Sequence, residues 1–172
     1  AAARGAQVTL ISANSVIEPP VGVHLISVVT TEEMRHETLA AALGADSVIM
    51  SAAPADFRPG EIAGAKMKKA EDGSSPSIEL VQNPDILVEL VQARSNPAQV
   101  IVGFAAETHD LMTYARGKLE RKNLQMVAAN SVANGKVFEQ DTNALEVVWQ
   151  GGQRSFPEMS KHELAQQLMQ LI

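Results

Sequence analysis

Short apolar runs alternate with helix-type patterns along most of this chain, and this alternation limits its possible folds more than any other feature. Strands that alternate with helices favour βαβ units, in which the connecting helices cover a parallel sheet. We therefore expect a doubly wound α/β domain with a mostly parallel sheet. The expected strands are Val8–Ile11, His24–Val29, Asp46–Met50, Ile78–Val81, Gln99–Val102 and Met126–Ala129, followed by a hairpin of Ala144–Trp149 and Arg154–Phe156.

Capping residues mark the expected helices. Ser, Thr and Asn side chains accept hydrogen bonds from the first backbone N–H groups of a helix, and Pro suits its first position. Glycine favours the left-handed conformation that ends a helix. The expected helices are Thr31–Leu43, capped by Thr30 or Thr31 and stopped by Gly44; one capped by Asn83 with Pro84 first; Thr108–Lys122; and one opened by a Ser160–Glu163 capping box.

The first residues indicate the end of a helix, with Gly5 as its C-cap, which runs into the strand Val8–Ile11. A doubly wound domain normally opens with a strand, a glycine-rich turn and a helix. We therefore expect residues 1–172 to form a single domain whose first strand and glycine-rich loop lie outside this sequence. The sequence carries no signal-peptide pattern.

Composition excludes several classes of protein. The chain has no cysteine, which excludes disulfides, thiolate metal sites and cysteine nucleophiles. Its formal net charge of -6 argues against a general nucleic-acid binder, because phosphate backbones select basic surfaces. No apolar run is long enough to span a membrane. The histidines, His24, His36, His109 and His162, lack the spacing of a metal site.

Two stretches are expected to leave the core. The segment Phe57–Ser77 contains Pro, Gly, Lys and Ser with little apolar periodicity, so it is predicted to be an excursion that includes the strand Ile78–Val81. The stretch Asn130–Thr142 is predicted to be a loop. Lysines in the excursion, at positions 66, 68 and 69, form either a solvated charge run or mobile charges that close over an anion.

Candidate site residues follow the predicted strands, where open α/β sheets bind ligands. The small residues Ser51 and Ala52 let a ligand approach the backbone, and Asp56 offers a carboxylate. A tight crossover in which Asp56 caps a turn is an equally acceptable interpretation. The run Asn83–Ile86 presents N–H groups that suit a phosphate, although a well-capped helix alone would also explain it.

The run Gly103–Glu107 is expected to place small residues and one aromatic ring at another strand end. Phe104 could pack against a base or fill the edge of the core. Lys118 and Lys122 are four residues apart and therefore share one helix face. They could reach phosphates from that face or simply be exposed to solvent.

In their order and in their residues, these runs resemble the phosphopantothenate–cysteine ligase family, and the resemblance covers nearly the whole chain. It is carried by Ala1–Ser12, Ser51-Ala-Ala-Pro-Ala-Asp-Phe-Arg58, Lys66-Met-Lys-Lys69, Asn83-Pro-Asp-Ile86, Val102-Gly-Phe-Ala-Ala-Glu-Thr108, Lys122-Asn123, Ala129-Asn130 and Asp141–Asn143. In bacteria this ligase is usually the C-terminal half of a bifunctional protein whose other half is a flavin-dependent decarboxylase. The fold implied is Rossmann-like, with a flap or dimer arm and a C-terminal hairpin.

The resemblance implies a CTP-dependent ligation of 4′-phosphopantothenate with cysteine through an acyl-cytidylate, in coenzyme A biosynthesis. Mg²⁺ would offset the charge of the triphosphate. It implies a cytoplasmic homodimer with composite sites, in which Lys66 comes from the flap as the catalytic residue. The nucleotide-binding residues implied are Met50, Ser51, Ala52, Asp56, Lys66, Asn83, Pro84, Asp85, Ile86, Phe104, Lys118 and Lys122.

The chain departs from the family at two places. Pro54 stands where the family often has Val, which removes one backbone N–H from the turn. The family's N-terminal Gly-Thr-Glu and Asn-x-Ser-Ser-Gly-Lys-Met-Gly segments have no counterpart in this sequence. We therefore expect the chain as written to bind CTP poorly and not to turn over.

Two alternatives from other classes remain. Tyr114 and Lys118 fit the Tyr-x-x-x-Lys pattern of nicotinamide-dependent short-chain oxidoreductases, although the serine and glycine-rich turn of such enzymes are absent from the sequence. The other alternative is a catalytically inert α/β module that serves only for dimerisation or regulation.

Overall fold

The computed structural model describes residues 1–68, 75–132 and 140–172. Its central sheet contains β3 (Ser47–Met50), β6 (Val100–Glu107), β7 (Met126–Ser131), β8 (Thr142–Trp149) and β9 (Gly152–Ser160), in that order. Strands β3, β6 and β7 are parallel, whereas β8 and β9 add an antiparallel hairpin. This arrangement confirms the predicted α/β class, parallel core and C-terminal hairpin.

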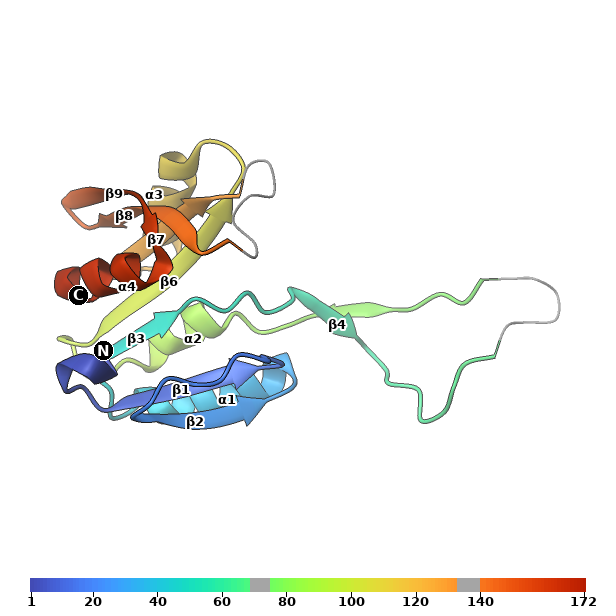
Figure 1. The fold of residues 1–172 in the computed structure, drawn as a ribbon. Coiled ribbons are helices and arrows are strands. Elements are labelled where there is room, and N and C mark those ends of the chain that lie inside the picture. Colours follow the sequence, from blue (N-terminus) through green and yellow to red (C-terminus); the bar gives the residue numbers. More distant parts are fainter. Residues whose placement is uncertain (69–74, 133–139) are drawn as a thin grey trace.

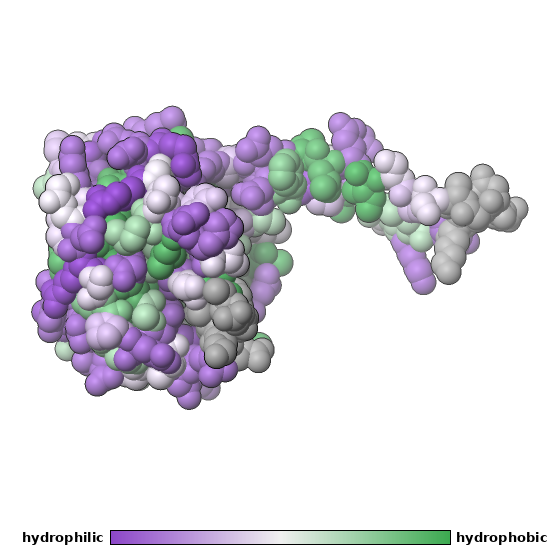
Figure 2. Space-filling model, turned by 90° about the horizontal axis from the view of Figure 1, so that it is seen from above, coloured by the Kyte–Doolittle hydropathy of each residue, from purple (hydrophilic) through white to green (hydrophobic). Residues whose placement is uncertain are grey.

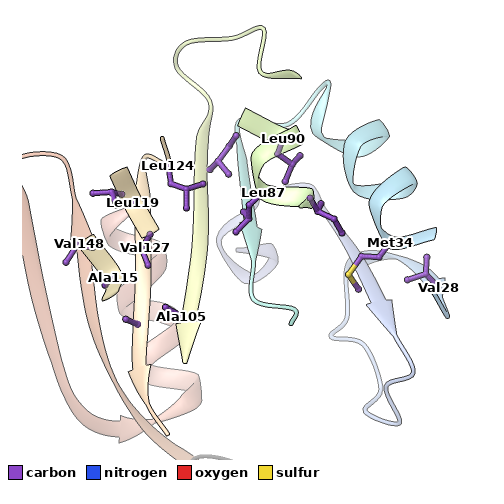
Figure 3. Packing of buried hydrophobic residues seen from close by; sticks show 13 residues of the cluster. Val28, Met34, Leu87, Leu90, Ala105, Ala115, Leu119, Leu124, Val127 and Val148 are labelled. Carbon is purple, nitrogen blue, oxygen red and sulfur yellow. The ribbon is translucent and has the colours of Figure 1, made fainter. Parts of the chain in front are cut away.

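Helices cover both faces of the sheet. Helices α1 (Thr31–Ala42), α2 (Ile86–Ala93) and α3 (Leu111–Arg121) contribute to one apolar cluster, which Figure 3 shows. Helix α4 (Lys161–Leu171) packs Leu164 and Leu168 into a second cluster, together with Val102, Val147 and Phe156 of the strands. Because each face of the sheet has its own helix layer, the expected doubly wound arrangement is confirmed.

Strands β1 (Val8–Ala13) and β2 (Val23–Val28) form a separate parallel pair. Helix α1 lies beside this pair and is tied to α2 by Arg35, whose Nη2 lies 2.7 Å from Glu89 Oε2. The buried amide of Gln99 donates to the carbonyls of Ala42 and Ala45, each at 2.7 Å, and so anchors the end of α1 to the start of β6. The pair is therefore attached to the body mainly through helix packing (Figure 1).

The chain begins with a short 3₁₀ helix, η1 (Ala2–Arg4), which ends at Gly5 with a φ of 88°. Glycine alone adopts this left-handed conformation without steric cost, so the predicted C-cap is confirmed. Thr30 caps α1 and forms a capping box with Glu33, and Ser160 does the same with Glu163 at the start of α4. These local signals identified three helix ends correctly.

Two sequence-based boundaries were wrong. Asp85 caps α2, because the Asn83 side chain instead holds the loop before β4. Strand β6 continues through Glu107, because β7 pairs with it as far as Glu107 and Ser131. The strand predicted at Ile78–Val81 is β5 (Leu80–Gln82), a short antiparallel strand just before Asn83.

The predicted excursion is an arm that projects from the body (Figure 1). We use "the arm" for residues 57–68 and 75–82. Its base is the ladder between β4 (Phe57–Pro59) and β5, extended by a hydrogen bond of 2.9 Å from Gly60 N to Glu79 O. Lys69 and most of the predicted loop Asn130–Thr142, residues 133–139, lie outside the described residues. In the described parts of the chain, no helix has the length and apolarity needed to cross a membrane.

Candidate functional site

Helix α3 brings two lysines to the carboxyl half of β6 and the start of α2. Lys118 Nζ donates to the carbonyl oxygen of Phe104. Lys122 Nζ forms an ion pair with Asp85 Oδ2 at 2.6 Å. The structure thus unites four sequence-predicted site residues from three elements in what we call the lysine cluster: Asp85, Phe104, Lys118 and Lys122.

Asp85 has two structural tasks in this cluster. Its Oδ1 accepts a hydrogen bond of 3.2 Å from Val88 N and caps α2. Burial alone would raise its pKa, but the Lys122 ammonium and the Val88 N–H outweigh this effect and hold the pKa of Asp85 below its ordinary value. Asp85 is therefore an anion at neutral pH and partly neutralises Lys122.

Of the two lysines, Lys118 has the less favourable environment for a positive charge. Partial burial is the largest influence and lowers its pKa, and the neighbouring charge of Lys122 lowers it further, against the opposing influence of Asp85 and Glu107. A half-buried ammonium beside a second cation gains more from an added anion than a solvated one does. A phosphate group would supply such an anion and form charge-assisted hydrogen bonds to both lysines.

Gly103 provides the space beneath Lys118. A Cβ atom at this position would lie 2.9 Å from Leu124 Cδ1, 3.2 Å from Leu87 Cδ1 and 3.8 Å from Lys118 Cε. The glycine therefore lets side chains from α2 and from the α3–β7 connection meet against β6. Met50, at the end of β3, is its cross-strand partner.

The ring of Phe104 lies apart from the lysines. It is half-buried against the cluster on the α4 face, whereas the neighbouring Gly103 contacts the side of Lys118. Successive side chains of a strand point to opposite faces. Packing of the Phe104 ring in the core is thus the interpretation that its position favours, while its carbonyl oxygen meets Lys118.

A cleft of about 490 Å³ lies between the end of β1 and the loop after β3. The exposed Ser51 and Ala52 line it, with Thr30 and Met34 on another wall. The carboxyl ends of parallel strands thus frame a hollow, as open α/β sheets commonly do. The other lining residues are Leu10, Ile11, Ser12, Ala13, Asn14, Val29, Thr31, Ala53 and Pro54.

Asn83 joins this loop to the start of α2. Its Nδ2 donates to Ala55 O at 2.8 Å, and its backbone N–H donates to Asp56 O, also at 2.8 Å. The end of the predicted run Ser51–Asp56 consequently lies beside the start of the run Asn83–Ile86. Asp56 is exposed, Pro84 is half-buried and Ile86 is buried in the core.

Lys66 is placed elsewhere. It is exposed and belongs to the arm, which extends away from the body in Figure 1. The structure of one chain therefore does not bring Lys66 to the lysine cluster.

Sequence reasoning missed two residues near the site. Arg58 Nη1 donates to Asn83 Oδ1 at 2.9 Å, and Glu107 acts electrostatically on Lys118. Arg58 closes the run that begins at Ser51, so the motif itself contained the signal. Glu107 closes the run that begins at Gly103, and only the continuation of β6 places it.

The Tyr-x-x-x-Lys pair does not form a proton-transfer pair here. The Tyr114 ring packs edge-to-face on His109 at 5.7 Å, whereas the Lys118 amine is bound to Phe104. Within the described residues, no three His, Cys, Asp or Glu side chains group together as a metal site would need.

Known proteins resemble this chain in sequence and in fold. The family model described as DNA/pantothenate metabolism flavoprotein C-terminal domain matches residues 1–172. The Coenzyme A biosynthesis bifunctional protein CoaBC of Vibrio cholerae is 44% identical over 173 residues, covering 100% of this chain and 43% of that protein. The CoaBC protein of Haemophilus influenzae is 42% identical over 171 residues, covering 99% of this chain and 42% of that protein. The chain thus spans about two-fifths of the length of these relatives.

A crystal structure of the C-terminal domain of a CoaBC bifunctional protein is also similar, with a TM-score of 0.79 and 28% identity. The match covers 99% of this chain and 74% of that one. The family model and the solved structure thus match this chain over nearly its whole length. The chain belongs to the family of DNA/pantothenate metabolism flavoprotein C-terminal domains.

Proposed function

We propose that this chain carries the CTP-dependent ligase activity that joins 4′-phosphopantothenate to cysteine in coenzyme A biosynthesis. The observation that supports it most is the lysine cluster, because two cations at the carboxyl edge of a doubly wound sheet suit a triphosphate. The names of the relatives place them in coenzyme A biosynthesis. These names do not fit the oxidoreductase alternative.

The proposed reaction has two balanced steps. A carboxylate oxygen of 4′-phosphopantothenate attacks the α-phosphorus of CTP, the bond to the β-phosphate oxygen breaks, and pyrophosphate leaves. The cysteine amine then attacks the acyl carbon, CMP leaves with the bonding electron pair, and the new amide loses a proton. Both steps depend on positioning and charge stabilisation more than on covalent help from the protein.

In this proposal the phosphate oxygens of the nucleotide replace the present hydrogen-bond acceptors of Lys118 and Lys122. Lys118 would turn from the Phe104 carbonyl, and Lys122 from Asp85, to the phosphate oxygens. Asn83, Asp85 and Ile86 would meet the nucleotide from the start of α2, while Met50 to Ala52 and Asp56 would approach from the loop after β3. CTP would enter as its Mg²⁺ complex, with the metal held by the oxygens of the triphosphate.

The arm suggests how Lys66 would take part. Five of its apolar side chains are more than half exposed, which is costly for a single chain, and Figure 2 shows apolar surface along it. The residues are Phe57, Ile62, Met67, Ile78 and Leu80. We propose that a second copy covers them in a homodimer and that Lys66 serves the site of the partner. A cytoplasmic location and fusion to a flavin-dependent decarboxylase complete the proposal.

The test is calorimetric titration of CTP, ATP and NADPH with Mg²⁺ into the chain and into a version extended at its N-terminus. We expect CTP to bind well only to the extended version, and we expect Lys118→Met and Lys122→Met in that version to weaken CTP binding about 10-fold or more, because each removes a charge-assisted hydrogen bond. Lys161→Met, at the exposed start of α4, is the matched control. Pyrophosphate release with phosphopantothenate would then test the first step.

Each outcome decides between the candidates. Binding of NADPH alone would favour the oxidoreductase, and binding of none of the three nucleotides by either version would favour the inert module. Equal affinity for CTP and ATP would leave ligation possible but remove the preference for cytidine.

A further inference from the structure

Two segments of the candidate site meet at the side chain of Asn83. The amide Nδ2 holds the carbonyl of Ala55 at 2.8 Å, and the backbone N–H holds the carbonyl of Asp56 at the same distance. The loop after β3 is therefore fixed to the residues that lead into α2. We call this set of hydrogen bonds the Asn83 joint.

Arg58 completes the joint from the other side. Its Nη1 donates to Asn83 Oδ1 at 2.9 Å and to the carbonyl of Gln82 at 3.1 Å. A guanidinium can only donate hydrogen bonds, so it selects the oxygen of the Asn83 amide. The Nδ2 group is then directed towards Ala55, and the orientation of the amide is determined.

The position of Arg58 in the fold explains why its side chain can reach Asn83 and orient the Asn83 side-chain amide. It lies on β4, the first strand of the arm, opposite Val81 of β5. Its side chain reaches along the ladder to the point where β5 leaves the arm for α2. Both hydrogen bonds come from Nη1, whose two hydrogens have directions fixed by the planar guanidinium. A lysine ammonium rotates freely, so it would hold the same two acceptors with less directional preference.

We propose that Arg58 is a positioning residue of the nucleotide site, acting through Asn83 and not by touching the nucleotide. This inference rests on the proposed function. Arg58 sets the distance between the Ser51–Asp56 loop and the start of α2, the two segments that would enclose the nucleotide.

The experiment uses the chain extended at its N-terminus, either unsubstituted or with Arg58→Gln or Arg58→Lys, and measures two quantities. The first is the Kd of CTP with Mg²⁺. The second is the hydrogen-exchange rate of the backbone N–H of Asn83, which donates to the carbonyl of Asp56. We expect Arg58→Gln to raise both about 10-fold, since it removes hydrogen bonds from a charged donor. Arg58→Lys should have a smaller effect. Arg154→Gln, an exposed arginine over Phe156 on β9, is the control.

A double-mutant cycle separates positioning from direct contact. If Arg58 acts through Asn83, then Arg58→Gln should change the Kd less than about twofold in an Asn83→Ala background, because the partner is already lost. Additive effects would mean that Arg58 contacts the ligand itself and would overturn the proposal. An unchanged Kd and exchange rate in Arg58→Gln would overturn it as well.

Failure of the proposed function would look different. If the unsubstituted extended chain bound no CTP, both the proposed function and the role of Arg58 at a nucleotide site would be wrong. Exchange of the Asn83 amide would still show whether Arg58 holds the joint.

Discussion

At the residue scale, Asp85 both caps α2 and neutralises Lys122, and the two tasks can be separated. Asp85→Asn keeps a good capping side chain but removes the negative charge. We expect the Kd of CTP to fall about 3- to 10-fold, since Lys122 would lose its competing anion, while the melting temperature changes little. Calorimetry and thermal unfolding check both values. Weaker binding would show instead that Asp85 orients Lys122 for the nucleotide.

Gly103 supports a second prediction at this scale. A methyl group there would lie 2.9 Å from Leu124 Cδ1 and 3.2 Å from Leu87 Cδ1, both on buried residues. We expect Gly103→Ala to lower the free energy of unfolding by about 1–3 kcal/mol through overpacking. Gly44→Ala is the matched control, because nothing lies within 4 Å of its added Cβ. Denaturant titration measures both, and equal stability of the two variants would contradict the packing argument.

At the element scale, the sequence predicted most helices and strands because their signals are local. The Thr30 and Ser160 caps lie beside the N–H groups that they bind. The start of α2 could not be predicted in the same way. Asn83 has the right chemistry for a cap, but its acceptor oxygen Oδ1 is taken by Arg58, 25 residues away. A long-range hydrogen bond thus overrode a local preference.

The same limit applies to the site. The sequence placed Lys118 and Lys122 on one helix face because four residues make about one turn. The sequence could not predict that Phe104 would contact Lys118 through its backbone carbonyl, while its ring packs elsewhere. That choice depends on the pairing of β6 with β7, which carries the strand past Gly103.

The first turn of α1 should make stability depend on pH. Glu33 accepts hydrogen bonds from the N–H groups of Val29 at 2.7 Å and Thr30 at 3.1 Å, and these lower its pKa below the ordinary value of 4.5. A carboxyl group whose pKa is lowered by folding stabilises the fold above its ordinary pKa, and this contribution is lost as pH falls through the folded pKa. Glu33→Gln should therefore flatten the loss of stability below pH 4.5. Urea titrations across this range measure the slope, with Glu120→Gln on α3 as control, and an unchanged slope would exclude Glu33 as a source.

At the scale of the whole molecule, the position of the arm determines whether one chain or two form a complete site. Its residues 57–68 and 75–82 extend from the body with exposed apolar side chains, so one chain leaves both the arm and Lys66 without a surface to act on (Figures 1 and 2). If a second copy supplies that surface, each complete site contains the body of one chain and the arm of the other. Phe57→Ser with Leu80→Ser should then shift sedimentation from dimer to monomer.

A mixing experiment tests whether such sites are shared. Lys66→Ala leaves the body intact, and Lys118→Met leaves the arm intact. In a heterodimer of these two variants, one site would combine an intact Lys118 with the partner's intact Lys66, and the other site would lack both. In the N-terminally extended chain, random exchange makes half of the dimers mixed. At a CTP concentration that saturates only the unsubstituted site, pyrophosphate release should recover to about a quarter of the unsubstituted rate, well above the rate of either variant alone. No recovery after subunit exchange would mean that each arm serves its own chain.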